Sequence, residues 1–384
     1  MQEKVRIAVV GCGAIGRVQA RELVKLSDCE LTALCNRHPE KAKALAEELN
    51  LDLPVFDDPG ELFAAGLCDA VTICLAPEQH CAVTCQALSA GLHVMVEKPM
   101  ARSLAECDAM LEAARRNGKT LAVICQNRYR SPAQRLKQVL KSGFLGPLTR
   151  AEVSSLWWRG ENYYDPAWRG TWQIEGGGCL MSHAVHQLDM TLWLLGRPLS
   201  VTASMYNRAH HNSECEDEVY ALLDYGDFTV LFTCSLNHHA EKQDLVFDGL
   251  NGTLSFTGMA YVSKALPNGY PAEDKEAIRA LKETLAAAPV LPSEGHGAQL
   301  QTFIEALLQG RKPEGCGEEG RDALELLMAL YKAAVTGKKV SLPLSPDDPF
   351  YRHETRVPLM PVFHQKRVSV EGSPVMEISL GSGT

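Results

Sequence analysis

A lysine suited to acid–base chemistry stands at the end of a predicted strand. The residues HVMVEKPM span positions 93–100, so Glu97, Lys98 and Pro99 directly follow four strand-forming residues. A surface ion pair at this place would contribute only about 0–1 kcal/mol. The alternative is that the tip of the strand presents the amine to a ligand. A lysine whose pKa is lowered by burial can accept the proton of a hydroxyl group.

A second set of reactive side chains lies on a helix predicted over about 179–195. Ser182, His186 and Asp189 share one face of this helix. The neighbouring buried stripe has steps of four and three and consists of Met181, Val185, Leu188, Leu192 and Leu195. An unperturbed imidazole titrates near neutral pH, so His186 is a candidate base. His183 and His186 also suggest a metal site, but no third ligand is evident, and we predict no metal.

The segment GCGAIG has the spacing of a dinucleotide-binding loop. It lies between the apolar run RIAVV (6–10) and the helical stretch VQARELVKL. Its first glycine permits a tight turn, its second lets the backbone approach a pyrophosphate, and its third allows close contact between helix and strand. The helix N-terminus offers unpaired N–H groups to the phosphates. The predicted contact residues are Gly11, Gly13, Ala14, Ile15 and Gly16.

The residue expected at the adenosine ribose is Asn36, 20 positions after Gly16, and Arg37 follows it. An aspartate or glutamate would hold the ribose hydroxyls and repel a 2′-phosphate. Asparagine removes that repulsion, and Arg37 can pair with a phosphate. A helix-capping asparagine beside a solvated arginine is the structural alternative. We predict NAD or NADP, with a modest preference for NADP.

Apolar runs alternate with helical stretches over residues 1–125. The runs are RIAVV (6–10), LTALC (31–35), AVTICLA (70–76), HVMV (93–96) and TLAVIC (120–125). Because they are apolar throughout, they indicate parallel strands covered on both faces. The fold predicted for this part is an α/β domain with a Rossmann doubly wound parallel sheet.

The pattern changes after residue 125. Strands are expected over 219–236 and 244–256, where Asn251-Gly252 is a hairpin turn signal. Helices are expected over 131–143, 179–195, 272–287, 297–309 and 318–336. We therefore predict an α+β domain at 126–343 with a large, mostly antiparallel sheet for substrate binding and oligomerisation. Residues 344–384, rich in proline and short polar stretches, are predicted to form an extended tail.

Composition excludes several classes of partner. The 384 residues carry a net charge of −9, with a pI near 5.8, which argues against nucleic acid. No apolar run approaches the roughly 18 residues of a membrane span. The start, MQEKVRIAVVGCG, enters a strand without a signal-peptide pattern. Since the thirteen cysteines are scattered through predicted strands and helices, we expect free thiols and a cytoplasmic protein.

Several spaced motifs together resemble one family. They are GCGAIG, LAPEQH (75–80), GLHVMVEKPM (91–100), QNRYRSP (126–132), GGGCLMSHAVHQLD (176–189) and the stretches 295–313 and 318–343. The chain is similar to the glucose–fructose oxidoreductase, inositol dehydrogenase and rhizopine-catabolism proteins (Gfo/Idh/MocA). The resemblance covers nearly the whole chain except the tail and about 260–292.

The resemblance implies roles at the ends of several strands. Lys98 would lie at the nicotinamide and the reacting hydroxyl, with the Lys98–Pro99 bond commonly cis, and Glu97 would hold the lysine or the ribose. Ala76, Pro77 and His80 would lie along the cofactor, although His80 is equally well a simple helix-start residue. Gln126 and Arg128 would touch nicotinamide or substrate, with structural pairing as the alternative.

Substrate contacts are expected from the second domain. The segment 155–178 holds four of the five tryptophans, and aromatic faces and arginine forks suit sugar rings and their polar groups. We predict a substrate wall from Trp168, Arg169 and Trp172. The family usually has Asp or Asn where Ser182 stands and histidine where His186 stands. Ser182, His183 and His186 complete the predicted substrate-binding residues.

The leading hypothesis is an NAD(P)-dependent dehydrogenase acting on a secondary hydroxyl of a sugar, glycoside or cyclitol. One alternative is an enzyme that keeps its cofactor bound and uses transient oxidation to drive elimination or bond cleavage. Another is a non-catalytic redox-sensing subunit, against which both Lys98 and His186 argue. The resemblance implies a homodimer or homotetramer.

Overall fold

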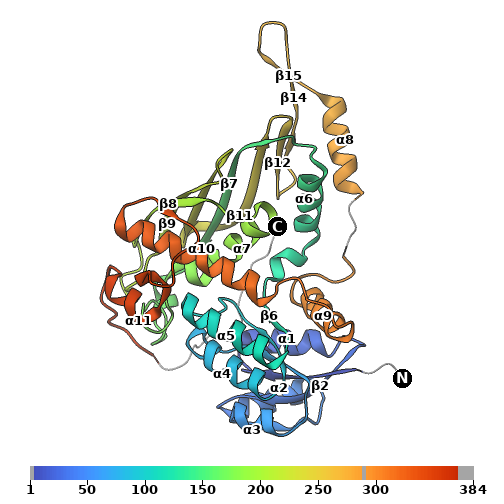
Figure 1. Cartoon of the computed structure of the whole chain (residues 1–384), viewed down its shortest axis with the longest axis vertical. Coiled ribbons are helices and arrows are strands. Elements are labelled where there is room, and N and C mark those ends of the chain that lie inside the picture. The colour runs from blue at the N-terminus through green and yellow to red at the C-terminus, as the bar shows by residue number, and fades with distance from the viewer. Residues whose placement is uncertain (1–3, 288–290, 371–384) are drawn as a thin grey trace.

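The first third of the chain folds into a six-stranded parallel sheet flanked by helices (Figure 1). The computed structural model describes residues 4–287 and 291–370. In the sheet order β3-β2-β1-β4-β5-β6, the strands are β1 (Val5–Val10), β2 (Cys29–Cys35), β3 (Val55–Phe56), β4 (Ala70–Ile73), β5 (His93–Val96) and β6 (Leu121–Val123). The intervening helices are α1 (Ala14–Leu23), α2 (Pro39–Glu48), α3 (Pro59–Ala64), α4 (Pro77–Ser89) and α5 (Leu104–Asn117). The predicted doubly wound sheet is confirmed.

Burial on both faces explains why the strands of this sheet are apolar at nearly every position. In β1, Ile7 and Val9 point into one core cluster, while Ala8 and Val10 point into the other. All four side chains are almost completely buried. A strand that is half exposed would instead alternate between apolar and polar residues.

Two elements of this domain were not predicted for it from the sequence. β3 is only two residues long. α9 (Gly295–Leu308) comes from much later in the chain and buries Leu300, Phe303 and Ile304 against the parallel sheet. The sequence assigned α9 to the second domain, but the helix returns to cover the first.

The second domain contains an eight-stranded sheet in the order β13-β12-β11-β7-β10-β9-β8-β16. Its strands are β7 (Leu148–Trp158), β8 (Ser200–Tyr206), β9 (Glu218–Asp224), β10 (Thr229–Ser235), β11 (Asn237–Gly249), β12 (Gly252–Ser255), β13 (Ala260–Tyr261) and β16 (Val340–Ser341). β7 and β10 run parallel, and the other neighbours are antiparallel. The predicted mostly antiparallel sheet is confirmed.

One face of this sheet is covered by helices. α6 (Ser131–Ser142), α7 (Val185–Leu195) and α10 (Gly317–Thr336) follow the predicted ranges closely. On β9 and β10, buried residues such as Ala221 and Phe232 alternate with exposed ones such as Leu222 and Leu231. The alternation places one face of each strand in the core and leaves the other open.

The β11–β12 hairpin turns one residue earlier than expected. Gly249 pairs with Gly252, so Leu250 and Asn251 form the turn, instead of Asn251-Gly252. Gly249 lies so close to the backbone of Leu145 that a Cβ atom would be 2.2 Å from the Leu145 carbonyl oxygen. This tertiary contact fixes the glycine inside the strand pair.

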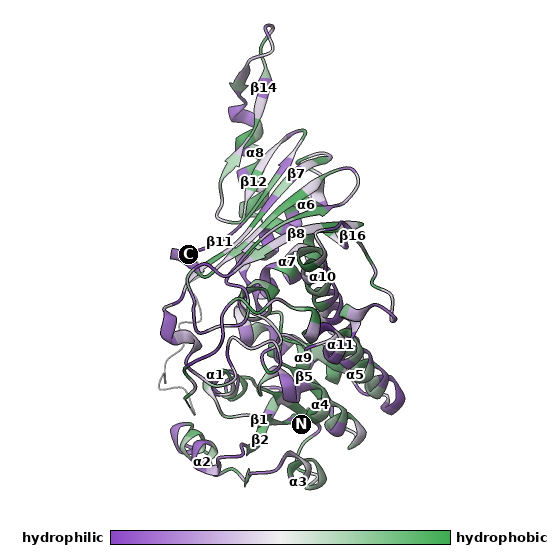
Figure 2. Ribbon diagram, turned by 90° about the vertical axis from the view of Figure 1, so that its left-hand side faces the viewer, coloured by the Kyte–Doolittle hydropathy of each residue, from purple (hydrophilic) through white to green (hydrophobic). Residues whose placement is uncertain are grey.

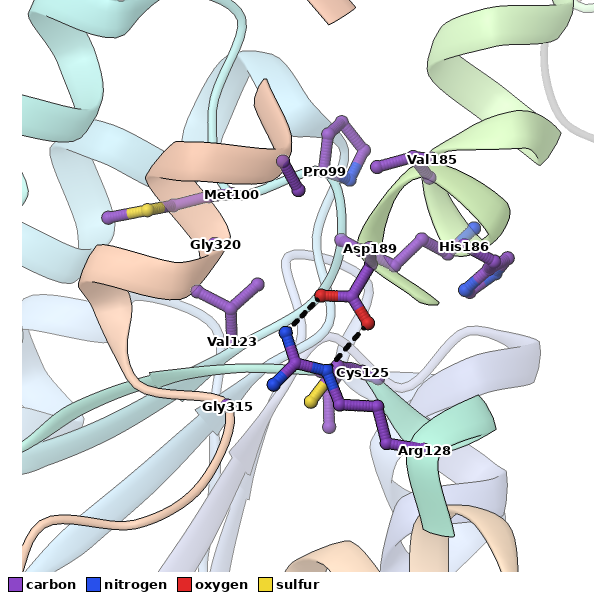
Figure 3. Close-up of a pocket in the computed structure, with 13 residues that line it drawn as sticks. Pro99, Met100, Val123, Cys125, Arg128, Val185, His186, Asp189, Gly315 and Gly320 are labelled. Atoms are coloured by element: carbon purple, nitrogen blue, oxygen red, sulfur yellow. Dashed lines mark hydrogen bonds and ion pairs between the residues drawn. The ribbon is translucent and has the colours of Figure 1, made fainter. Parts of the chain in front are cut away.

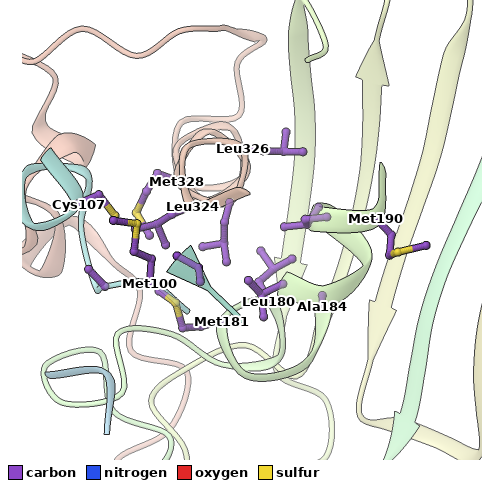
Figure 4. Packing of buried hydrophobic residues seen from close by; sticks show 14 of the residues in the cluster. Met100, Cys107, Leu180, Met181, Ala184, Met190, Leu324, Leu326 and Met328 are labelled. Carbon is purple, nitrogen blue, oxygen red and sulfur yellow. The ribbon is translucent and has the colours of Figure 1, made fainter. Parts of the chain in front are cut away.

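The helix predicted at 179–195 begins as a π-helix, Leu180–Ala184, and continues as α7. The π-helix packs in a core shared by both domains (Figure 4). Met100 and Cys107 from the first domain contribute to this core, together with Met181 on the π-helix and Met328 on α10. The end of β5 and the predicted catalytic helix are therefore held by one packed cluster.

The hairpin of residues 263–273 forms an arm that projects from the body (Figures 1 and 2). After β13, the hairpin β14 (Ser263–Ala265) and β15 (Pro271–Glu273) extends outward, and α8 (Lys275–Ala286) returns alongside α6. The sequence resemblance did not extend over this segment. Residues 288–290 lie outside the described part.

The described part of the tail, residues 344–370, is folded against the body. It contains the short helical turns Pro349–Tyr351, His353–Arg356 and Val357–Leu359. Phe350 and Arg356 are buried, and Arg356 Nη1 donates to the carbonyl oxygen of Gly176 at 2.9 Å. An extended tail was expected here; apolar anchors spaced along a proline-rich segment explain the difference. In the described part of the chain, no helix combines the length and apolarity needed to span a membrane.

Candidate active site

Lys98 follows β5 at the carboxyl edge of the parallel sheet. Its ammonium group donates to the carbonyl oxygen of Ser182 at 3.2 Å, which joins the first domain to the π-helix. The Lys98–Pro99 peptide bond is cis. Burial lowers the pKa of Lys98; Glu97 opposes this shift, and Arg169 adds to it. The amine is therefore not a surface ion pair but a partly buried base held in a fixed position.

Glu97 forms no ion pair with the lysine amine in the described structure and is 5% exposed. Its carboxylate accepts from Gln19 Nε2 at 2.6 Å and from the backbone N–H of Lys98 at 3.1 Å, and His296 Nε2 lies 3.7 Å away. Burial alone would raise the pKa of Glu97, but contact with His296 and the charge of Lys98 outweigh it, so that the pKa is lowered. Glu97 is thus a fixed buried anion behind the lysine.

His80 secures the turn that carries Lys98. Its Nδ1 atom lies 2.9 Å from the Pro99 carbonyl oxygen, and its Nε2 atom lies 3.0 Å from that of Leu75. The side chain has no exposed surface. The expected contact between His80 and a cofactor is therefore wrong: its ring joins the ends of β4 and β5 from within.

The π-helix and the first turn of α7 bring Ser182, His183 and His186 to the lysine. Ser182 Oγ donates to the Gly178 carbonyl oxygen at 2.8 Å and lies 2.8 Å from His183 Nδ1. Burial lowers the pKa of both imidazoles well below the usual value, and the cationic Lys98 lowers both further. Both rings are therefore neutral near neutral pH, whereas the sequence suggested ordinary titration of His186.

A small cavity of about 20 Å³ adjoins Lys98 and His186 (Figure 3). Arg128 lies in its wall, but its donors are committed: Nε and Nη2 bind Asp189 at 2.8 and 2.6 Å, and Nη1 binds Glu319 at 3.0 Å. Asp189 projects from the same helix as His186 and faces Arg128 (Figure 3). Since Arg128 is only 2% exposed, the structure assigns it to a buried ion-pair network and not to the predicted substrate contact.

Tyr163, Arg169 and Glu175 form a second polar group beside the lysine. Arg169 Nη1 donates to the Tyr163 hydroxyl and, at 3.2 Å, to Glu175, which is 4% exposed. The Arg169 guanidinium lies 4.1 Å from the Tyr163 ring centroid and 4.2 Å from that of Trp168. Arg169 and Trp168 were expected here, whereas Tyr163 and Glu175 were missed. Both lie in the segment 155–178 from which the substrate wall was predicted, and this was the available signal.

Trp172 does not join this group. It is 2% exposed, packs edge-on against Tyr331 at 5.3 Å between ring centroids, and donates from Nε1 to the Pro361 carbonyl oxygen at 2.8 Å. The predicted substrate-wall role of Trp172 is therefore wrong. The folded tail covers it and makes it a core residue.

The glycine-rich loop has room for a pyrophosphate. Gly11 has a φ of +99°, and a Cβ atom on Gly16 would lie 1.8 Å from the Gly11 carbonyl oxygen, so both glycines are required by the protein itself. Gly13 is different: it is exposed, and a Cβ atom there would meet nothing within 4 Å. Ala14 and Ile15 then open α1, whose N-terminus has no side-chain cap. These features fit a phosphate group over Gly13.

Other residues at this sheet edge also fit a dinucleotide. Asn36 Oδ1 accepts from the Cys12 N–H at 3.0 Å and Nδ2 donates to the His38 carbonyl oxygen at 2.9 Å, while Arg37 is exposed. Ala76 and Pro77 begin α4 and are partly exposed. The Oε1 atom of Gln126 is buried without a partner in the described structure, as a residue that awaits a ligand would be.

Comparison with known proteins identifies the family. Residues 5–125 match the oxidoreductase family with an NAD-binding Rossmann fold, and residues 133–255 match the GFO/IDH/MocA C-terminal domain. The chain belongs to the GFO/IDH/MocA family. It is therefore an oxidoreductase with an NAD-binding domain, and the resemblance seen in the motifs is confirmed.

Relatives match over most of their length. The D-glucoside 3-dehydrogenase of Escherichia coli (strain K12) is 27% identical, with 88% of this chain and 97% of that protein covered. The myo-inositol 2-dehydrogenase of Thermotoga maritima is 26% identical, with 88% and 98% covered. The crystal structure of the WlbA dehydrogenase from Bordetella pertussis in complex with NADH and UDP-GlcNAcA has a TM-score of 0.77 and 27% identity, with 90% of this chain and 99% of that chain covered.

Proposed function

We propose that this GFO/IDH/MocA oxidoreductase oxidises a secondary hydroxyl of a sugar, glycoside or cyclitol, with NAD or NADP as hydride acceptor. The observation that carries the proposal is the Lys98 amine, which has a lowered pKa and is fixed to Ser182 at the carboxyl edge of the sheet. Ligands of doubly wound sheets bind at this edge. The relatives named as glucoside and inositol dehydrogenases support the choice of substrate class.

Lys98 in its neutral form accepts the hydroxyl proton. The Ser182 carbonyl oxygen orients the amine, and Glu97 supplies a fixed negative charge that stabilises the ammonium formed after transfer. His186 is neutral and offers an imidazole nitrogen as a second hydrogen-bond partner for the hydroxyl. The cofactor, when bound, takes the hydride. General-base contributions of this kind are typically about 10²–10⁴-fold.

For the cofactor we propose a preference for NADP. The side chain at the expected ribose position is the asparagine Asn36 and not a carboxylate, and both of its polar atoms bind the backbone. Arg37 is exposed beside it, with a guanidinium that suits a 2′-phosphate. The related WlbA structure contains NADH, which makes the comparison of both cofactors informative.

We also propose a cytoplasmic homo-oligomer that uses the open face of the eight-stranded sheet. Tyr220, Leu222 and Leu231 are 46%, 49% and 38% exposed on this face. Apolar side chains clustered on an exposed sheet favour contact with a second copy. All thirteen cysteines are free, as in a reducing compartment. Light scattering should give a dimer or tetramer, and a monomer at all concentrations would contradict this part.

The test is a substrate panel followed at the nicotinamide absorbance band. Neutral sugars, uronates, glycosides and inositols are each assayed with NAD and with NADP. The proposal expects a substrate-dependent increase in reduced cofactor with at least one compound, and a higher kcat/KM for NADP than for NAD. No reduction with any member would contradict the proposed activity, and strong preference for NAD would contradict only the cofactor assignment.

A further inference from the structure

One arginine beside the candidate active site has no acidic partner. Arg159 follows β7 directly, and its Nη1 atom donates to the Trp158 carbonyl oxygen at 2.7 Å. Within residues 4–287 and 291–370, no aspartate or glutamate forms an ion pair with its guanidinium. Neighbouring arginines differ: Arg128 binds Asp189, and Arg169 binds Glu175.

Arg159 faces the site and not the open side of the sheet. Trp157 is a buried residue of β7, on the face that the helices cover, and the Arg159 guanidinium lies beside it. The guanidinium carbon is 5.2 Å from the Trp157 ring centroid and 5.6 Å from that of Tyr163. Both rings also contact His183, at 5.3 and 5.8 Å between centroids. Two aromatic rings therefore hold the guanidinium next to the π-helix.

The charges around this position do not balance. The charge of Glu97 acts on Lys98, and Glu175 binds Arg169, whereas no acid in the described part of the chain pairs with Arg159. The acid nearest to Arg159 in sequence, Glu161, accepts instead from the backbone N–H groups of His211 and Asn212, at 3.2 and 2.8 Å. The excess positive charge also reaches His183: its pKa is lowered by burial first and then by Arg159.

We propose that the sugar substrate carries a carboxylate, as a uronic acid or its glycoside does, and that Arg159 binds this group. The inference rests on the proposed function, because it places the reacting hydroxyl at Lys98. A guanidinium presents two parallel donors that match the two oxygens of a carboxylate. A neutral sugar would leave a partly desolvated cation without a counter-charge. A sugar phosphate is also negatively charged, so glucose 6-phosphate is assayed as a separate substrate.

The test compares matched substrates on wild type and on Arg159→Met. Glucose, glucuronate and glucose 6-phosphate are assayed with the better cofactor. Wild type should prefer glucuronate in kcat/KM. Arg159→Met should raise KM for glucuronate by about 10–100-fold, the range for a lost charge-assisted hydrogen bond, and should raise KM for the neutral sugar by much less. Arg150→Met is the control, because Arg150 lies at the opposite end of β7, exposed and paired with Asp248.

Several results would overturn the inference. A higher kcat/KM for glucose than for glucuronate in the wild type would contradict a carboxylate site. An equal fall in kcat/KM for all three sugars in Arg159→Met would contradict it too. A higher kcat/KM for glucose 6-phosphate than for glucuronate would mean that the site binds a phosphate and not a carboxylate. If no sugar is oxidised, calorimetry with glucuronate and reduced cofactor separates the two proposals. Binding to wild type that is lost in Arg159→Met supports the carboxylate site even though the proposed activity has failed, and absence of binding contradicts both.

Discussion

The environment of Lys98 determines the pH at which its amine can accept a proton. Burial lowers the pKa of Lys98, and the nearest opposing influence is the buried carboxylate of Glu97. Glu97 is held by Gln19 and by the backbone N–H of Lys98, so its charge has a fixed position in the structure. The charge of Glu97 therefore raises the pKa of Lys98 although the two charged groups form no ion pair.

Replacing Glu97 with glutamine should shift the acid limb of the pH–rate profile for oxidation, where the rate rises with pH, to lower pH. Glu97 raises the pKa of Lys98, so its neutralisation lowers that pKa and makes the free amine available at a lower pH. We expect a shift of about one unit in the midpoint of kcat/KM against pH. Glu112→Gln, at an exposed site on α5, is the control. An unchanged or higher midpoint in Glu97→Gln would exclude Lys98 as the titrating base.

At the residue scale, the sequence located side chains at strand ends and on helix faces better than it foresaw which side chains are buried. Lys98, Ser182 and His186 could be found because a strand end and a helix face fix their directions. Arg128 and Trp172 have equally suitable chemistry, but both are 2% exposed. Their burial depends on partners such as Asp189 and the tail, which are distant in sequence.

The π-helix that carries Ser182 and His183 is anchored by a buried carboxyl group. Glu216 has no exposed surface and accepts from the N–H groups of Gly178 and Leu180, both through Oε1 at 3.2 and 3.0 Å, and from the Tyr331 hydroxyl at 2.9 Å. A Cβ atom on Gly178 would lie 1.9 Å from the Glu216 carbonyl oxygen, so only glycine fits there. Burial raises the pKa of Glu216 to about 7.

Glu216 should make the stability of the protein depend on pH. Its pKa is about 7 in the folded state, against an ordinary 4.5. A raised folded pKa gives stability that is complete below the unfolded pKa and lost as pH rises through the folded one. The loss between pH 4.5 and about 7 is on the order of 3 kcal/mol. Glu216→Gln should flatten this part of a urea-unfolding series against pH.

A matched variant separates this effect from the general pH dependence of the protein. Glu273→Gln changes an exposed carboxyl on the projecting arm and should leave the slope as in wild type. If Glu216→Gln keeps the wild-type slope, the carboxyl is not the titrating group.

At the element scale, the strands of the first domain were predictable because two-sided burial makes them apolar. β3 was not, since two residues carry no period. The π-helix was read as an α-helix, because its extra residue per turn has no signature in side-chain types. The β11–β12 turn lies one residue earlier than predicted because Gly249 packs on Leu145. Local turn preferences do not take this tertiary contact into account.

The tail joins the two domains into one folded body. Phe350 belongs to the main core cluster and is 2% exposed, and Tyr351 Oη donates to Asp108 on α5 at 2.5 Å. Arg356 reaches the Gly176 carbonyl oxygen beside the π-helix. Residues 344–370 therefore support the segment on which the candidate catalytic residues lie.

Shortening a buried side chain of the tail should destabilise the whole protein. Phe350→Ala removes a buried aromatic ring and should reduce the free energy of unfolding by about 3–5 kcal/mol. Leu359→Ala, in the same tail but 45% exposed, should change it by less than about 0.5 kcal/mol. Urea unfolding measures both. Equal small effects would mean that the tail does not contribute to the cooperative fold.

The most direct test of Lys98 as the base that accepts the hydroxyl proton is a single-turnover measurement on Lys98→Met. Enzyme in excess over cofactor is mixed with the best substrate of the panel, and reduced nicotinamide is followed by absorbance while cofactor affinity is measured by fluorescence. Methionine keeps a side chain of similar length but has no amine to accept the proton. We expect a burst of reduced cofactor in the wild type, a burst rate lower by at least about 10²-fold in Lys98→Met, and nearly unchanged cofactor affinity. A burst of wild-type rate in Lys98→Met would contradict the role of Lys98 as the base.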